Sequence, residues 1–142
     1  MGSEATAKAA TITTHTPDRV DAADVNLALV SGSLASEPEA RSLPSGSVAM
    51  SFSLTVRKPG HKTTSVPIVW YDPPKRVNQW KPGDVVVVSG QVVRRFFRGS
   101  GGLGSATEVV VVSAQLARHT AKVDRLLAGA AQAVSERAAS SH

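Results

Sequence analysis

The clearest pattern along the chain is a strict alternation of side-chain types from Val48 to Arg57. Every second residue is apolar and large, and these positions are Val48, Met50, Phe52, Leu54 and Val56. A period of two is typical of a strand that buries one face. The turn at Pro59-Gly60 is followed by Thr63–Tyr71, which predicts another strand, with Val66, Ile68 and Trp70 sharing a face.

The longest strand signal is a run of valines that begins after Gly83-Asp84 and continues to Val93. Branching at Cβ disfavours helix and favours strand, and the run is too apolar for a surface strand. Gly90 interrupts it, as glycine does where a strand bends or where another backbone passes closely. The run ends in Arg94-Arg95-Phe96-Phe97-Arg98, just before the glycine-rich segment Gly99–Ser105. We therefore expect a buried strand that emerges into cations and rings, followed by a loop.

Weaker patterns complete the predicted β domain. They indicate a first strand at Asn26–Leu34, a loop at Ala35–Ser47, a short helical turn at Lys75–Lys81 and a last strand at Ala106–Leu116. Five strands with short connections and internal glycines predict an all-β fold, a small closed or nearly closed barrel. A two-sheet sandwich is the alternative, because strand number alone does not distinguish the two.

The apolar period changes after Thr120. Apolar residues then recur at helical spacing, at Val123, Leu126, Leu127, Ala130, Ala131 and Val134. This predicts an amphipathic C-terminal helix with an alanine-rich stripe that docks on its own barrel or on a partner. The chain thus divides into a flexible segment at 1–25, a barrel domain at 26–118, and a helix with a tail at 119–142.

Charge adds a functional indication to this organisation. The 142 residues carry a net charge of +5, and residues 26–118 alone have eleven basic and five acidic side chains. A basic domain is what nucleic-acid binding requires, although a soluble basic domain without that role has the same composition. There is no cysteine, no apolar run of membrane-spanning length and no signal-peptide pattern near Met1, so we expect a cytoplasmic protein without membrane contact.

Catalytic and cofactor signals are weak. His15, His61, His119 and His142 are scattered without metal-ligand spacing, and the nucleophile-elbow and Walker motifs are absent. The segment Gly99–Gly104 formally reads as GxGxxG, but it lies between two predicted strands and no helix follows to receive a pyrophosphate. We expect neither enzymatic activity nor a metal or cofactor.

Several short motifs, in this order, resemble bacterial single-stranded DNA-binding proteins. They are Asn26–Gly32 in the first strand, Glu37–Gly46 after it, Phe52 and Leu54, then Lys81–Asp84, Gly90–Phe97 and Thr107–Val110. The resemblance covers Asn26 to Arg118. It implies an OB-fold barrel, sequence-tolerant binding of single-stranded DNA, with RNA as an alternative, and a homo-oligomer, either tetramer or dimer. It also implies a bacterial, nucleoid-associated protein in replication, repair and recombination.

The chain departs from that family in two places. It ends in Ser140-Ser141-His142 rather than in an acidic-hydrophobic tip, so recruitment of repair proteins through such a tip is not expected. The early tryptophan of the family's third strand is replaced near Thr64. The competing hypothesis is therefore an OB-fold interaction module that has lost DNA binding and docks through its C-terminal helix.

The candidate contacts combine cations for phosphates with rings for stacking against bases. Phe97 and Trp70 match positions where the family places aromatic residues, and Arg57 and Lys58 end the polar face along which the family tracks DNA. The predicted nucleic-acid-binding residues are Arg57, Lys58, Trp70, Arg76, Arg94, Arg95, Phe96, Phe97 and Arg98. Phe96 and Phe97 should face opposite ways on a regular strand, whereas Phe52 and Trp80 are predicted core residues.

Overall fold

The computed structural model describes the backbone of residues 24–140 and the side chains of residues 24–136. The N-terminal segment that was predicted to be flexible therefore lies almost entirely outside the described residues. The chain groups into two compact units, of which Asn26–Ala130 contains the whole sheet and the first half of the C-terminal helix. The rest of that helix belongs to the second unit.

The described chain is mostly β, with one C-terminal helix, as predicted. The elements are β1 (Ala28–Leu34), β2 (Glu39–Ser42), β3 (Val48–Val56), β4 (Thr64–Tyr71), the 3-10 helix η1 (Lys75–Gln79), β5 (Val85–Gly99), β6 (Gly102–Leu116) and α2 (Thr120–Ser140). Two loop predictions were wrong. The segment Ala35–Ser47 contains the short strand β2, and most of Gly99–Ser105 is strand, because β6 begins at Gly102.

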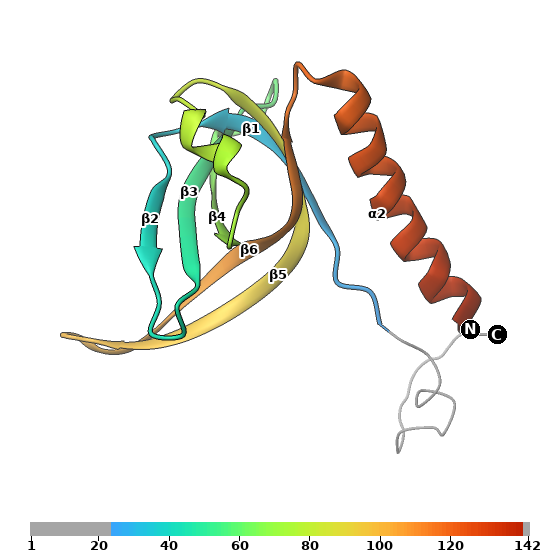
Figure 1. Ribbon diagram of the computed structural model, residues 1–142. Helices are drawn as coiled ribbons and strands as arrows, with labels where there is room; N and C mark the ends of the chain where they lie inside the picture. Colours follow the sequence, from blue (N-terminus) through green and yellow to red (C-terminus); the bar gives the residue numbers. More distant parts are fainter. Residues whose placement is uncertain (1–23, 141–142) are drawn as a thin grey trace. The chain divides into compact units, whose positions relative to one another are not determined.

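The strands close into a ring (Figure 1). Their order is β1-β5-β6-β4-β3-β2, and an additional pairing of β1 with β3 joins the two sides. Only the β4–β6 pairing is parallel, and the others are antiparallel. β2 adds to the outer edge of β3 and is not part of the ring.

The closure depends on Gly32, where β1 passes from β5 to β3. Gly32 pairs with Val86 of β5. The next residue, Ser33, pairs with both β5 and β3, and Leu34 pairs with β3. A Cβ atom at position 32 would lie 2.5 Å from the Thr55 carbonyl oxygen, which is closer than van der Waals contact permits. Glycine is therefore required where the two backbones approach.

The interior of the ring holds the hydrophobic core. Phe52 packs edge-on against Trp80, with ring centroids 6.0 Å apart, and Trp70 lies 5.8 Å from Trp80. The core cluster comprises Leu34, Met50, Phe52, Leu54, Ile68, Trp70, Val77, Trp80, Val86, Val88, Val109, Val111, Ala114 and Leu116. The core assignments of Phe52 and Trp80 are thus confirmed, as is the buried alternating face of β3.

Helix α2 forms where the sequence predicts it, but its predicted apolar stripe is only partly covered. Leu126 and Ala130, four residues apart on one face, are buried, whereas Leu127 and Val134 remain exposed. Among the described residues, no helix combines the length and apolarity needed to cross a bilayer.

Candidate nucleic-acid interface

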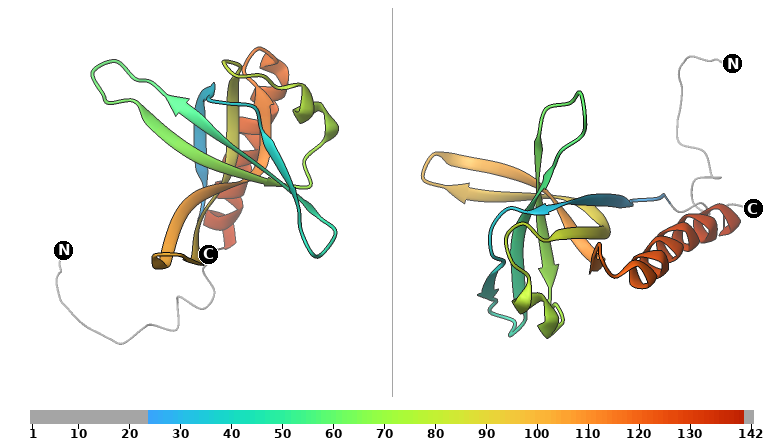
Figure 2. Two further views of the ribbon diagram at one scale, coloured as in Figure 1. Left: turned by 90° about the vertical axis from the view of Figure 1, so that its left-hand side faces the viewer. Right: turned by 90° about the horizontal axis from the view of Figure 1, so that it is seen from above.

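β5 and β6 continue past their other neighbours and form a two-stranded arm, defined here as Val92–Glu108. The pairing of β1 with β5 ends at Gly90, and the pairing of β4 with β6 covers only Val109 and Val110. β5 and β6 remain paired with each other to the tip, where Gly99 faces Gly102. At about 3.3 Å per residue the arm extends about 25 Å from the ring, and its projection is visible in both views of Figure 2.

Two local features hold the base of the arm. A β-bulge between Ser89 and Gly90 redirects the strand as it leaves the ring. The side chain of Asn26 then satisfies the backbone of Val92, because its Nδ2 donates to the Val92 carbonyl and its Oδ1 accepts from the Val92 N–H, both at 2.9 Å. Asn26 thereby satisfies the edge of β5 at Val92, two residues beyond Gly90, the last residue that pairs with β1.

The register assigns the arm residues to two faces, because directly opposed residues of antiparallel strands share a face. One face carries Arg94, Phe96 and Arg98 opposite Thr107, Ser105 and Leu103. The other carries Val93, Arg95 and Phe97 opposite Glu108, Ala106 and Gly104. The two phenylalanines therefore lie on opposite faces, as predicted.

On the first face an arginine covers an open ring. The Arg94 guanidinium carbon lies 5.5 Å from the centroid of the Phe96 ring, and Arg94 Nη2 donates a hydrogen bond to Ser105 Oγ at 3.0 Å. Phe96 is 73% exposed and Leu103, near the tip, is 78% exposed. Arg98 forms no hydrogen bond or ion pair with any described residue, so its charge is available to a ligand.

The second face repeats the arrangement more tightly. The Arg95 guanidinium carbon lies 5.5 Å from the centroid of the Phe97 ring, and Arg95 Nη2 donates to Oε1 of the buried Glu108 carboxylate at 3.3 Å. The Phe97 ring rests on Gly104, where an added Cβ would come within 2.9 Å of the ring. Phe97 nevertheless stays 44% exposed, so part of the ring remains open.

This combination of exposure and chemistry is unusual for a strand pair. Residues with high β propensity normally pack into a core, yet Val92, Val93, Phe96 and Phe97 are all exposed. Three arginines against one glutamate give the arm a formal charge of +2. Exposed rings accept the faces of unpaired bases, and guanidinium groups beside them attract phosphates.

The other predicted contacts lie elsewhere. Arg57 and Lys58 follow β3 in the turn toward β4, where both are exposed. Figure 2 shows this β3–β4 hairpin projecting from the ring in a different direction from the arm. The structure therefore provides two separate basic hairpins.

Trp70 and Arg76 lie side by side away from the arm, and only Trp70 is too deeply buried to be a contact. Trp70 is only 8% exposed, with its ring packed on Trp80, so a base cannot stack on it and this prediction needs correction. Arg76 is half-buried, with its guanidinium 5.7 Å from the Trp70 ring centroid and its Nη2 donating to the Ala114 carbonyl at 2.9 Å. The next residue, Tyr71, ends β4, and its aromatic ring is exposed.

The sequence analysis did not predict Leu103 and Ser105 as parts of the arm, nor Asn26 as the residue that holds its base. The first two lie in a segment that its glycines led us to treat as a loop. In the structure the segment closes a hairpin through the two-residue turn Ser100-Gly101, which is a common hairpin length. Asn26 carries no local signal, because its partner Val92 is 66 residues away.

Two further observations bear on the site. Among the described side chains, no three histidine, cysteine or acidic groups lie together as metal ligands would. No protein-family model matches the chain, and no curated protein sequence matches it, so the resemblance to single-stranded DNA-binding proteins stays a prediction.

Proposed function

We propose that this chain is an OB-type barrel protein that binds single-stranded DNA, or RNA, with little sequence preference. The arm is the main contact, and the β3–β4 hairpin adds a second group of cations. The observation that carries the proposal is the pair of exposed phenylalanines, Phe96 and Phe97, each covered by an arginine two residues earlier. By the same resemblance, the protein would act as a homo-oligomer.

The ring topology supports the OB assignment. An OB-fold is a five-stranded Greek-key barrel, and here five strands close in the order β1-β5-β6-β4-β3, with β1 as the joining strand. A short helical segment, η1, connects β4 to β5 and packs Val77 into the core. OB-folds bind oligonucleotides on one barrel face and on adjoining loops, and the projecting hairpins extend such a surface.

The chemistry of the arm supports sequence tolerance. Phe96 and Phe97 present ring faces, and each base has a π-face, so stacking selects unpaired strands without selecting sequence. Arg98 is unpaired among the described residues and Arg94 is held only by Ser105, so both can turn toward phosphates. Arg95 is held by Glu108 and serves mainly to position Phe97.

Binding should weaken steeply with salt. If Arg94, Arg98 and one cation of the β3–β4 hairpin each displace one counterion from a single strand, log K falls with log salt at a slope of about −2. Between 50 and 200 mM NaCl the affinity for a labelled oligo-dT would then fall about twentyfold. Fluorescence anisotropy measures this directly. If no binding occurred at 50 mM salt, the result would favour the interaction-module hypothesis instead. The exposed apolar residues of the arm, such as Leu103, are compatible with contact to a protein partner.

Single ring removals should identify which face of the arm stacks on bases. Phe96→Ala and Phe97→Ala should each weaken oligo-dT binding by about 1–3 kcal/mol if their rings are used, without lowering the melting temperature. Tyr71→Ala is the matched control, because it removes a ring of similar exposure that is not on the arm. A loss in Tyr71→Ala as large as in Phe97→Ala would show that the arm does not carry the stacking.

A further inference from the structure

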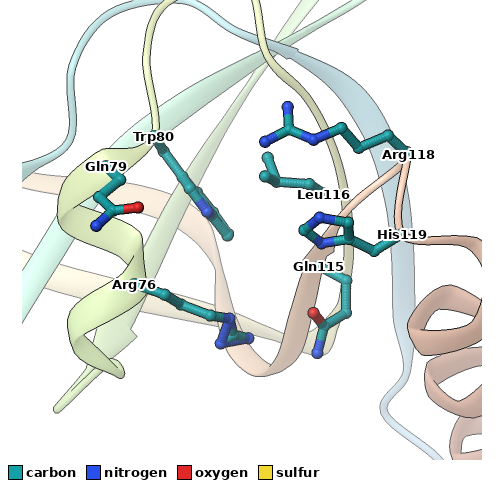
Figure 3. A pocket seen from close by; sticks show the side chains of 7 residues that line it. All are labelled: Arg76, Gln79, Trp80, Gln115, Leu116, Arg118 and His119. Atoms are coloured by element: carbon teal, nitrogen blue, oxygen red, sulfur yellow. The ribbon is translucent and has the colours of Figure 1, made fainter.

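A polar pocket lies away from the arm, between η1, the end of β6 and the start of α2 (Figure 3). Its volume is about 150 Å³, and it is lined by Arg76, Gln79, Trp80, Gln115, Leu116, Arg118 and His119. All of these residues belong to the compact unit Asn26–Ala130. The apolar part of the lining is Trp80 and Leu116, both of which are buried core residues.

The charged part of the lining has one sign. Arg76 and Arg118 contribute guanidinium groups, Gln79 and Gln115 contribute amides, and no carboxylate is among the lining residues. Figure 3 shows the two guanidinium groups on opposite sides of the pocket, Arg76 on η1 and Arg118 after β6, with Trp80 and Leu116 between them. Two cations that line one hollow without a counter-charge create a favourable potential for an anion.

Arg76 is held in place before any ligand arrives. Its Nη2 donates to the Ala114 carbonyl at 2.9 Å, and its guanidinium lies 5.7 Å from the Trp70 ring centroid. These contacts leave other N–H groups of the planar fork for a ligand. Arg118, by contrast, is exposed and forms no ion pair with any described residue. The fixed Arg76 guanidinium supplies one set of charge-assisted hydrogen bonds for an oxyanion, and the exposed Arg118 side chain would turn inward to supply the second.

We propose that this pocket binds a phosphate group of the monoester type. An apolar cavity of the same size holds a ligand about as large as benzene, so the pocket accommodates one phosphate group but not a whole nucleotide. The rest of the ligand would remain in solvent. The ligand is either a small phosphorylated molecule or the terminal phosphate of a nucleic-acid strand, and the two share the same recognition chemistry.

Tryptophan emission provides a direct test on the intact protein. The chain has only two tryptophans, Trp80 lines the pocket, and Trp70 packs on Trp80. Inorganic phosphate, titrated at constant ionic strength with NaCl, should produce a saturable change in emission. Arg118→Gln should weaken this binding about tenfold or more while the melting temperature stays unchanged, because it removes charge-assisted hydrogen bonds from an exposed side chain.

Arg41→Gln is the matched control, because Arg41 is an exposed arginine of β2 that does not line the pocket. If Arg41→Gln and Arg118→Gln weakened phosphate binding equally, the effect would come from net charge alone and the proposal would be overturned. No saturable change with inorganic phosphate, thymidine monophosphate or 5′-phosphorylated oligo-dT would overturn it as well. Isothermal titration calorimetry with the same probes checks that the emission change reports binding.

Two oligonucleotides distinguish the sources of the phosphate. If the strand end is the ligand, 5′-phosphorylated oligo-dT binds more tightly than the 5′-hydroxyl form, and Arg118→Gln removes the difference. If a small molecule is the ligand, inorganic phosphate binds but the two oligonucleotides bind equally. Equal weakening of both oligonucleotides by Arg118→Gln would place the pocket on the path of internal phosphates and contradict a monoester site. The phosphate titration does not depend on DNA binding by the arm.

Discussion

Shortening the arm should abolish most single-strand binding while leaving the ring folded. Replacing Phe96–Ser105 by Asn-Gly joins Arg95 to Ala106, which are directly opposed in the register. A two-residue Asn-Gly turn is the preferred connection for such a pair. The change removes both phenylalanines, and at 1 kcal/mol or more for each lost stacking contact the affinity for oligo-dT should fall at least about thirtyfold.

The shortened chain should keep its melting temperature because no residue of Phe96–Ser105 belongs to the core cluster. It also retains Arg95 with its partner Glu108, so no buried carboxylate loses its counter-charge. The matched control replaces only Ser100-Gly101 by Asn-Gly and keeps the arm at full length. If anisotropy showed the shortened chain and this control binding oligo-dT equally well, the arm could not be the interface.

Gly90→Ala should be among the most destabilising single substitutions in the chain. An added Cβ would lie 2.2 Å from the Val110 carbonyl oxygen and 2.9 Å from Val109 Cγ1. The oxygen belongs to the backbone of the adjacent strand, so relief requires β5 and β6 to separate where both leave the ring. Overpacking of this kind costs about 2–3 kcal/mol, which corresponds to a melting temperature about ten degrees lower.

Calorimetry or thermal circular dichroism measures this effect. Gly99→Ala is the control, because a Cβ there meets no atom within 4 Å and the backbone does not require glycine. Its melting temperature should match that of the unmodified protein within about two degrees. A Gly90→Ala protein that melted alongside the control would show that the two strands accommodate a side chain at the bulge, contrary to the geometry.

Much of the fold follows from local patterns. The alternation in Val48–Val56, the valines of β5 and the helical period after Thr120 each mark an element that the structure contains. The short strand β2 escaped because all four of its residues, Glu39–Ser42, are exposed and show no alternation. β2 is a strand because its backbone pairs with the adjacent edge of β3.

The candidate site was predictable where residue chemistry alone was enough. The Arg-Arg-Phe-Phe-Arg sequence predicted cations and rings at the end of β5, and strand alternation placed Phe96 and Phe97 on opposite faces. Trp70 shows the opposite case. Its own period, shared with Val66 and Ile68, indicated the core, whereas the family resemblance indicated a contact surface, and its burial agrees with the period.

The sequence by itself determined the strands that bury a face, which of their side chains share that face, and that cations and rings follow the valine run. Only the tertiary structure decided which of those faces are covered. Phe96 and Trp70 both lie in strands. Phe96 is exposed because the pairings of β1 with β5 and of β4 with β6 do not extend as far as the arm, whereas Trp70 is buried inside the ring. The physical reason is that burial depends on backbone pairings between residues far apart in the chain, such as Ala28 with Gly90 and Ile68 with Val109, which no local pattern specifies.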